Sequence, residues 1–517
     1  MSGSLIDAAK LELPLSLDAD VVIVGSGAGG SVLAARLTAA GLRVVMLEAG
    51  PWVTKEQLTL REEDAFQGMY QDRGTRFTGD GSIGILQGRV AGGGTTVNWT
   101  TCYRTPDRVL EHWAKVHGVT GLSSAVLEPH FDAVEGRLNI APWPVELANA
   151  NNQKLLDGAK KLGWQAAPTK RNVKACANSG YCGMGCPVDA KQAMHVTYLP
   201  DALADGLTLV VNCPVDRLER QGARMTGVKG RAHLPAAGRA TGQEVTVAAK
   251  TVVVSAGAIN SPALLLRSGI DAQGRVGRRT FLHPVIGILG RYEDPVLGFY
   301  GAPQSVASHQ FVEPEPGGVG FFFEAAPVHP VLAASVLPKI GAQAQEAMAQ
   351  LAHFSALIAL HIDGFAPGDE GGTVSLRPGG APRLDYPISA ALQRTFKTSH
   401  RKLAELTLAA GADWAMTLHS QPYMLRSPAD LPGLSQLAYG AHEHFLVSAH
   451  QMGGCMTGPD PNNSVVDARF KVHGLENLFI VDGSVFPTSL GVNPSQTIYG
   501  LAHRSAEWVA ASVGKAL

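Results

Sequence analysis

The chain has 517 residues, with 43 Lys or Arg against 44 Asp or Glu, so its formal net charge is −1. This balance leaves no strongly basic surface, and nucleic acid is therefore not an expected partner. The length allows a large core and two domains, and six cysteines in a chain of this size do not make a disulfide scaffold.

The first ten residues carry no recognisable targeting signal. They lack a basic region, a twin arginine and a long apolar core, so we expect no signal peptide. No apolar run approaches the roughly 18–20 residues that a transmembrane helix needs. A short run such as Phe354 to Ile362 is expected in the core. We therefore expect a cytoplasmic protein without a transmembrane segment, which leaves peripheral contact with a membrane open.

Residues 18–50 have the pattern of a strand, a glycine turn, a helix and a second strand. Residues 1–17 are expected to be a leader to this unit. The apolar run 21–24 is typical of a buried parallel strand, and residues 31–40 carry apolar side chains at helical spacing. The second strand is expected over 44–47 and ends at an acid, Glu48.

Three glycines in the turn have separate tasks. Gly25 permits a tight turn, Gly27 lets the backbone approach a pyrophosphate, and Gly30 lets the helix pack closely on the strand. A bound pyrophosphate would then meet free N–H groups at the positive end of the helix. Glu48 lies about 20 residues further on, where an acid can accept hydrogen bonds from ribose hydroxyls. The combination predicts a dinucleotide site without deciding between NAD and FAD.

The segment 79–98 is rich in glycine and ends Gly88-Arg89-Val90-Ala91-Gly92-Gly93-Gly94-Thr95-Thr96-Val97-Asn98. Such a run is not expected to form a regular element, but its backbone can approach a flat ligand closely. The apolar residues, the arginine and the asparagine within it favour an ordered loop over a flexible one.

The remaining elements alternate between α/β segments and a central region of different character. Residues 276–445 mix prolines, glycines and aromatics with short β-like runs, which is typical of an antiparallel sheet with helices. The other expected elements are surface helices in 106–141, a helical stretch up to 204, strands at 207–211, 246–256 and 478–482, and helices at 263–268, 341–353 and 494–513.

Four stretches together resemble the glucose–methanol–choline (GMC) oxidoreductase family of FAD enzymes, and their order spans nearly the whole chain. The first is the turn at Gly25, Gly27 and Gly30 with Glu48. The others are Gly88-Arg89-x-x-Gly92-Gly93-Gly94 with Asn98, then Gly257-Ala258-Ile259-x-Ser261-Pro262, and the C-terminal pair Ser448-Ala449-His450-Gln451-Met452-Gly453-Gly454 and Gly491-Val492-Asn493-Pro494. The C-terminal strings look closest to the cholesterol-oxidase and long-chain-alcohol-oxidase branches.

The resemblance implies an α/β fold in which a Rossmann-like FAD-binding domain is assembled from separated segments. A substrate domain with an antiparallel sheet and helices would cover the flavin. The expected FAD segments are 17–130, 195–275 and 446–517, with a connecting region at 131–194 and the substrate domain at 276–445.

Alcohol oxidation by a flavin requires a hydride to move to flavin N5 and a proton to move to a base. Histidine suits the second task because its pKa lies near working pH, and the resemblance points to His450. Asn493 has two readings. Asn before Pro494 is a good helix N-cap, and in the family this position holds His or Asn facing the substrate. The positive end of a helix starting at Pro494 would also stabilise a reduced flavin.

The resemblance also implies the cofactor contacts. They are Gly25, Gly27, Ala28, Gly30, Glu48, Ala49, Arg89, Gly92, Gly93, Gly94, Thr95, Asn98, Val215 through its backbone, Ala256, Gly257, Asp482, Gly483, Asn493 and Pro494. Some relatives attach FAD covalently to a histidine near the glycine loop. Residues 79–98 contain no histidine, so we expect non-covalent FAD.

Cys176, Cys182 and Cys186 have the spacing C-x5-C-x3-C on a short glycine-rich loop. Three thiolates so placed could hold an iron–sulfur cluster, and the spacing resembles that in FAD subunits of multi-subunit sugar dehydrogenases. A plain structural loop is the alternative, since buried free cysteines are common. Zinc would need a fourth ligand, for which His195 is a candidate.

Three functions follow from this reading. The first is an FAD-dependent alcohol dehydrogenase or oxidase acting on a fairly apolar primary or secondary alcohol. The second is an FAD sugar or polyol dehydrogenase with an iron–sulfur relay and partner subunits. The third is a lyase or light-driven enzyme on the same scaffold. The electron acceptor, whether oxygen, a quinone or a cytochrome, is left open.

Overall fold

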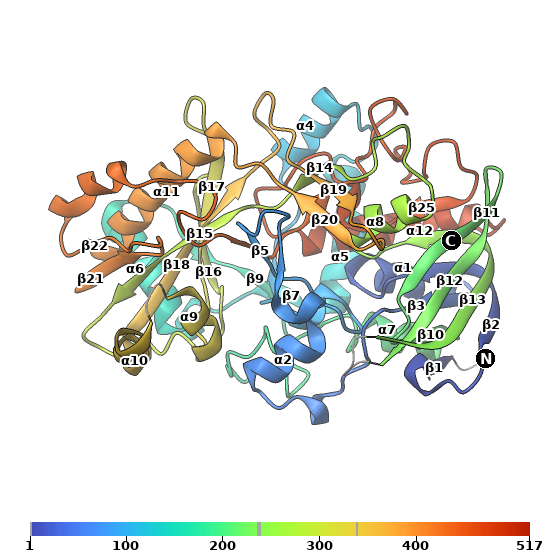
Figure 1. Ribbon diagram of the computed structural model, residues 1–517, viewed down its shortest axis with the longest axis horizontal. Helices are drawn as coiled ribbons and strands as arrows, with labels where there is room; N and C mark the ends of the chain where they lie inside the picture. Colours follow the sequence, from blue (N-terminus) through green and yellow to red (C-terminus); the bar gives the residue numbers. More distant parts are fainter. Residues whose placement is uncertain (1–2, 235–238, 338–339) are drawn as a thin grey trace.

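The computed structural model describes residues 3–234, 239–337 and 340–517. Within these ranges the two largest sheets lie at opposite ends of the long axis of the molecule (Figure 1). We call the eight-stranded sheet with its helices the parallel half, and the ten-stranded sheet with its helices the antiparallel half.

The sheet of the parallel half has the order β1-β10-β3-β2-β13-β12-β11, with β25 also pairing with β13. Its strands are β1 (Ser4–Asp7), β2 (Leu15–Val24), β3 (Val44–Leu47), β10 (Thr208–Val211), β11 (Val215–Gln221), β12 (Arg224–Leu234), β13 (Arg239–Val254) and β25 (Leu478–Ile480). All pairs are parallel except β11 with β12 and β12 with β13.

Apolar clusters on both faces explain why the last four residues of β2, 21–24, are all apolar. Val21 and Ile23 pack in one cluster, whereas Val22 and Val24 pack in another. The first cluster includes residues of the contacting helices α1 (Ala28–Ala39), α5 (Ser124–Leu138), α7 (Tyr198–Ala204) and α12 (Ser495–Ala511). The second includes residues of α4 (Asp107–His117) and α8 (Asn260–Arg267). Strands buried on both faces need apolar side chains in both directions.

The sheet of the antiparallel half has the order β4-β5-β23-β15-β18-β17-β16-β8, with β21 and β22 branching from β15. Its strands are β4 (Arg76–Phe77), β5 (Gly84–Ile85), β8 (Ala167–Pro168), β15 (Val285–Arg291), β16 (Val306–Phe311), β17 (Gly320–Ala325), β18 (Phe354–Ile362), β21 (Trp414–Thr417), β22 (Met424–Leu425) and β23 (Val447–Ser448). Its helices are α6 (Ala150–Leu162), α9 (Pro330–Val336), α10 (Gly341–Ala349) and α11 (Ala390–Ala409).

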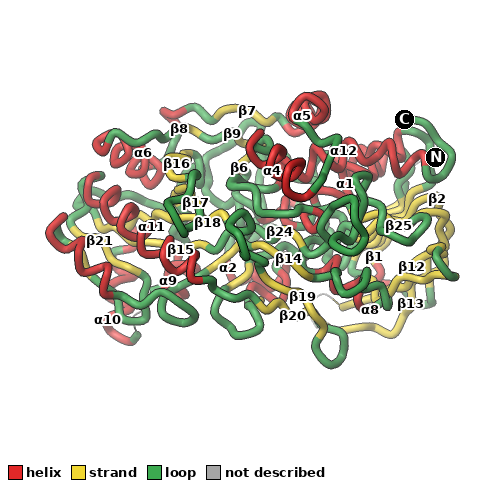
Figure 2. The backbone as a smooth tube through the Cα atoms, turned by 90° about the horizontal axis from the view of Figure 1, so that it is seen from above, coloured by secondary structure: helices red, strands yellow, loops and turns green. Residues whose placement is uncertain are grey.

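Two small sheets lie between the halves (Figure 2). One contains β14 (Arg278–Phe281), β19 (Gly372–Leu376), β20 (Pro382–Asp385) and β24 (Met452–Gly453), and the other contains β6 (Thr101–Cys102), β7 (Ile140–Pro142) and β9 (Lys170–Asn172). The remaining helices are α2 (Glu62–Met69) and α3 (Gly94–Val97). The predicted combination of a mixed α/β sheet with an antiparallel sheet and helices is thus confirmed.

Several local predictions were wrong. The leader contains β1, which pairs with β10 at the sheet edge, so these residues belong to the fold. The segment 79–98 contains β5 and one turn of helix, α3, because partners from distant parts of the chain order it. The helix expected up to residue 204 starts only at Tyr198.

The division into five segments stays a prediction. Segments 195–275 and 276–445 each include residues outside the described ranges, 235–238 and 338–339. Within the described ranges, no helix is long and apolar enough to cross a bilayer.

Candidate active site

A cavity of about 570 Å³ runs from the parallel sheet into the antiparallel half. Its walls come from the carboxyl ends of β2, β3 and β13, from the glycine-rich loop before α3, and from β15 and β18. The carboxyl ends of parallel strands are where α/β sheets bind their ligands.

The first glycine turn is held by close backbone contacts. Gly25 has φ +100°, and a Cβ there would lie 2.3 Å from the Ser255 carbonyl oxygen. A Cβ on Gly30 would lie 2.1 Å from the Gly25 carbonyl oxygen. Gly29, which the sequence pattern did not single out, is as constrained, because its Cβ would lie 1.9 Å from the Val481 carbonyl oxygen. These positions therefore admit only glycine.

The backbones of the two glycine-rich loops are in direct contact. A Cβ on Gly93 would lie 2.8 Å from the Gly27 Cα, while a Cβ on Gly27 would have nothing closer than 4.0 Å. Buried Ser26 joins the loops, since its Oγ accepts a hydrogen bond from Gly92 N at 3.0 Å and donates to Glu48 Oε2 at 2.6 Å. The backbone N–H groups of Ser26 and Gly50 also donate to the Glu48 carboxylate, at 2.9 and 2.7 Å. Sequence reasoning missed Ser26.

The loop at 256–261 is fixed by Asp482. Its Oδ2 accepts hydrogen bonds from Gly257 N at 2.8 Å and from Ser261 Oγ at 2.5 Å. Its Oδ1 accepts from Ser484 N at 2.8 Å. Asp482 therefore ties the end of β25 to the start of α8 at the cavity wall.

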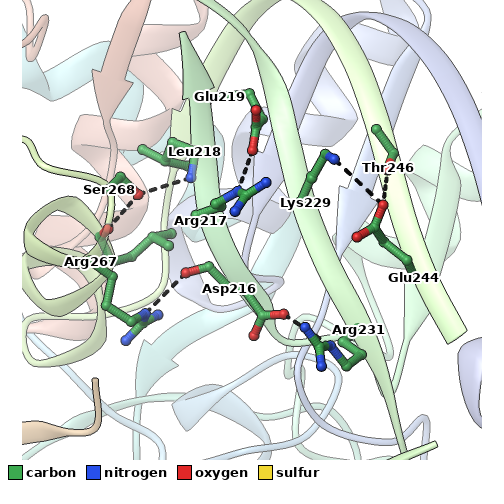
Figure 3. Close-up of polar contacts among 11 residues, drawn as sticks. Asp216, Arg217, Leu218, Glu219, Lys229, Arg231, Glu244, Thr246, Arg267 and Ser268 are labelled. Atoms are coloured by element: carbon green, nitrogen blue, oxygen red, sulfur yellow. Dashed lines mark hydrogen bonds and ion pairs between the residues drawn. The ribbon is translucent and has the colours of Figure 1, made fainter. Parts of the chain in front are cut away.

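Arg267 positions the start of β11 (Figure 3). Its guanidinium donates to the carbonyls of Val215 and Asp216, at 3.3 and 3.1 Å. Ser268 Oγ accepts from Leu218 N at 2.9 Å and so ties the same strand to α8. Val215 and Arg267 both line the cavity at this end.

Nearly all of the predicted cofactor contacts line the cavity. They are Gly25, Gly27, Ala28, Glu48, Ala49, Arg89, Gly93, Gly94, Thr95, Asn98, Val215, Ala256, Gly257, Asp482, Gly483, Asn493 and Pro494. The two that do not are Gly30 and Gly92, which act through the packing described above. His195 contacts Thr96 Oγ1 in the second loop at 3.0 Å and is not part of the cavity lining.

The cysteine loop is joined through Lys191 to residues next to the cavity wall. Lys191 is buried, and its ammonium donates to the carbonyls of Thr96, Asn98 and Cys182 at 2.6, 3.1 and 2.7 Å. It thereby ties the cysteine loop to α3 and to Asn98. Burial lowers the pKa of Lys191 to about 8, while the Cys182 and Cys186 thiols oppose that shift.

The three cysteines do not form a metal centre in this arrangement. Within the described ranges, no group of three His, Cys, Asp or Glu side chains could hold a metal ion. Cys182 Sγ lies 3.6 Å from Arg171 Nη2, and Cys186 Sγ accepts from Lys191 N at 3.4 Å. The cluster and zinc predictions therefore lack structural support, and we assign the loop a supporting role.

His450 and Asn493 meet at the cavity wall. Asn493 Nδ2 lies 3.3 Å from His450 Nε2, although the two residues come from distant loops. Burial lowers the pKa of His450 to about 4, so the imidazole is neutral at neutral pH. On its other side, His450 Nδ1 lies 3.2 Å from Nδ1 of fully buried His283, whose Nε2 accepts from Gly491 N at 3.1 Å.

The helix-cap reading of Asn493 was wrong. Helix α12 begins at Ser495 with Pro494 as its N-cap residue, and no side chain caps it. The Asn493 amide is turned to His450 instead, and its buried Oδ1 has no hydrogen-bond partner. A buried polar atom without a partner at a cavity wall is a group that a ligand can satisfy.

Glu324 on β17 is a polar residue that sequence reasoning missed. It is completely buried, and neither carboxyl oxygen has a hydrogen-bond partner. Burial raises its pKa to about 8, and the neighbouring Asn493 amide only partly opposes that shift. A signal was present, because an acid inside Gly320-Phe-Phe-Phe-Glu-Ala is out of place in a buried strand.

The cavity extends into the antiparallel half, and we call the apolar residues that line it there the tail pocket. They are Val285, Ile286, Ile288, Leu289, Ala326, Pro327, Val328, Leu332, Ala333, Val336, Leu337, Phe354, Ala356, Ile358, Leu360, Leu418, Phe445 and Val447. The site thus combines a polar pair with a long apolar extension.

Comparison with protein families gives two matches. Residues 20–285 and 367–502 match the N-terminal and C-terminal parts described as GMC oxidoreductase. An uncharacterized GMC-type oxidoreductase of Mycobacterium tuberculosis is 33% identical over 516 residues, which cover 98% of this chain and 79% of the relative. A long-chain-alcohol oxidase of Arabidopsis thaliana is 28% identical and is matched over 95% of this chain and 68% of its own length.

Solved structures show the same fold at lower identity. A pyridoxine 4-oxidase from Mesorbium loti superposes with a TM-score of 0.68 at 20% identity, over 95% of this chain and 99% of the other. A formate oxidase superposes with a TM-score of 0.68 at 15% identity, over 96% and 98%.

Proposed function

Because the chain belongs to the GMC oxidoreductase family of FAD enzymes, we propose that it oxidises an apolar alcohol to an aldehyde or ketone. The observation that carries this proposal is the continuity of the cavity. The His450–Asn493 pair lines the same cavity as the apolar residues of the tail pocket and the predicted cofactor contacts. An alcohol with an extended apolar group matches that combination, and the similarity to a long-chain-alcohol oxidase supports it.

The residues at the parallel sheet fit FAD. The glycine loops leave room for a pyrophosphate, and Trp99 Nε1 and His233 Nδ1 are buried at the cavity wall without partners. Bound FAD would supply the hydride acceptor, flavin N5. We propose non-covalent binding, because residues 79–98 contain no histidine and His195, which contacts Thr96, does not line the cavity.

In this proposal Asn493 holds the alcohol oxygen and His450 takes the hydroxyl proton at Nε2. A neutral imidazole can act as a base, and the low pKa of His450 keeps it neutral above about pH 4. With an apolar alcohol bound, the apolar residues of the cavity wall would exclude water from the reacting oxygen.

His283 sets a condition on this role. Gly491 N–H donates to Nε2 of His283, so a neutral His283 carries its proton on Nδ1 and donates it to His450. In that tautomer His450 carries its own proton on Nε2, where it would oppose the Asn493 Nδ2 donor 3.3 Å away, so one neutral imidazole does not satisfy both contacts. We therefore propose that the contact between the two imidazoles opens when the alcohol binds, which lets His450 carry its proton on Nδ1 and leaves Nε2 free.

An anaerobic panel of alcohols tests the function. Purified protein with bound FAD is mixed with straight-chain, cyclic and sugar alcohols, and loss of the visible flavin band is followed. Bleaching by apolar alcohols but not by sugars supports the proposal. Bleaching by sugars alone would favour a sugar dehydrogenase, and a flavin that no alcohol bleaches would favour a lyase or light-driven enzyme. Admitting air, a quinone or a cytochrome to the reduced enzyme then identifies the acceptor.

A further inference from the structure

Helix α9 forms part of the wall of the tail pocket, in the antiparallel half and away from the parallel sheet (Figure 1). Leu332, Ala333, Val336 and Leu337 face the pocket, and Ala333 is only 6% exposed. Val331 lies on the outer face and is 44% exposed. One face of this short helix therefore contacts whatever fills the pocket, while the other meets solvent.

The start of α9 is held by a carboxylate from another helix. Glu62 of α2 accepts hydrogen bonds from Val331 N at 2.6 Å and Leu332 N at 2.9 Å. His329, the N-cap residue, makes no side-chain cap, and Pro330 has no N–H to be satisfied. Glu62 is buried, so its two acceptors serve this helix rather than solvent.

Glu62 carries no ion pair to a Lys or Arg in the described ranges, and burial raises its pKa despite the two backbone donors. A buried carboxylate is costly unless its hydrogen bonds are good. The two hydrogen bonds to Val331 and Leu332 explain why a carboxylate is buried here, because they fix the position of α9. The helix thus forms a wall of defined position rather than a loose cover.

We propose that α9 sets the length of alkyl chain that the enzyme accepts, with Ala333 and Val336 as the gauge and Glu62 as the residue that positions the helix. This inference rests on the proposed alcohol oxidation. The substrate class that it assigns is an unbranched primary alcohol, whose hydroxyl lies at His450 and Asn493 and whose chain end lies against α9. The apolar side chains of the tail pocket suit an unbranched alkyl chain.

Two substitutions in opposite directions test the gauge. Ala333→Phe fills the pocket at α9 and should shift the preferred chain to shorter alcohols, with a loss of roughly tenfold or more in kcat/KM for the longest ones. Val336→Ala enlarges the pocket and should shift the preference to longer alcohols. Val331→Phe places a phenylalanine on the outer face of the same helix and is the control. The assay is anaerobic flavin reduction by straight-chain alcohols from butanol to octadecanol.

Substitution of Glu62 tests the positioning. Glu62→Ala removes both acceptors and should raise KM for long alcohols while leaving kcat for butanol and the FAD content unchanged. Glu62→Gln keeps one acceptor oxygen and should restore part of the long-chain KM. A merely structural role would instead lower FAD content and slow all alcohols alike.

The outcomes separate this inference from the proposed function. If short and long alcohols reduce the flavin but Ala333→Phe and Val331→Phe leave the same length preference, the gauge is overturned and alcohol oxidation stands. Equal shifts in Val331→Phe and Ala333→Phe overturn the gauge as well. If Ala333→Phe does not fold with FAD, an unchanged preference in Val336→Ala overturns it. A flavin that no alcohol bleaches overturns both.

Discussion

The two ends of the cavity are built in different ways. At the parallel sheet the walls are backbone, with glycine loops in contact and hydrogen bonds from main-chain N–H groups. In the tail pocket the walls are side chains on strands and on α9. The backbone walls contain glycines that no other residue can replace, whereas the side-chain walls depend on the size and shape of each side chain. Substitutions of these glycines should therefore abolish FAD binding or folding. Substitutions in the tail pocket should instead change substrate preference in proportion to the change in side-chain size.

The largest effect is expected at Gly29. A Cβ there would lie 1.9 Å from the Val481 carbonyl oxygen, and neither backbone can withdraw without moving α1 or β25. We expect Gly29→Ala to be recovered without FAD or not to fold. Gly68→Ala is the matched control, because a Cβ at that helical glycine meets nothing within 4 Å. The flavin-to-protein absorbance ratio checks both, and normal FAD content in Gly29→Ala would contradict the backbone account.

His450→Ala should act on chemistry and leave binding intact. Loss of a general base typically slows a reaction by about 10²–10⁴-fold, so flavin reduction should fall by that factor while FAD content stays normal. Stopped-flow reduction under anaerobic conditions measures the rate. Loss of FAD together with activity would show that His450 belongs to the backbone-built end rather than to the reacting pair.

His283→Ala sharpens the same assignment. If His283 holds His450 in the tautomer with its proton on Nε2, its removal frees the base, and flavin reduction should change by less than about tenfold. Nitrogen-15 NMR of the labelled histidines should show the His450 proton moving from Nε2 to Nδ1. A loss as large as that in His450→Ala would mean that His283 is needed to orient the ring.

An intermediate effect is expected at Lys191, which lies behind the cavity. Lys191→Met leaves three carbonyls without their donor, and each buried unsatisfied group costs about 1–3 kcal/mol. We expect lower thermal stability and weaker FAD binding, with Lys191→Arg recovering part of both. An unchanged affinity for FAD would show that the cysteine loop does not support the cofactor end. Iron analysis of the unchanged protein tests the loop separately, and we expect no bound iron.

The same two ends of the cavity differ in how well the sequence predicts them. The turn at Gly25–Gly30 and the two strands that flank it could be predicted, because a backbone that approaches a ligand needs glycines at fixed spacing. His450 and Asn493 were found only through resemblance, since a lone histidine or an Asn-Pro pair has no spacing of its own.

Ser26, Lys191 and Glu62 were not found, because their partners lie far away in the sequence and no local pattern encodes such contacts. The tail pocket could not be predicted from the sequence either. Apolar residues that line a pocket and those that fill a core look alike in a sequence, and only their arrangement separates them.

Glu324 is expected to have the smallest effect on flavin reduction and a graded effect on stability. Its pKa in the folded protein is about 8, above the ordinary value of 4.5, so the folded state binds a proton that the unfolded state has released between these pH values. Stability should therefore fall as pH rises through this window, by at most about 1.4 kcal/mol per pH unit. Glu324→Gln removes the titration and should flatten the dependence.

Thermal unfolding from pH 5 to pH 9 measures the effect of Glu324. The substituted protein should be relatively more stable at pH 9 than at pH 5, because only the charged carboxylate is penalised by burial. Parallel curves for the two proteins would mean that Glu324 is ionised or solvated in the folded state. Flavin reduction in Glu324→Gln then tells whether this carboxyl, next to Asn493, belongs to the reacting pair or only to the wall behind it. A rate within about tenfold of the unchanged enzyme would place it in the wall.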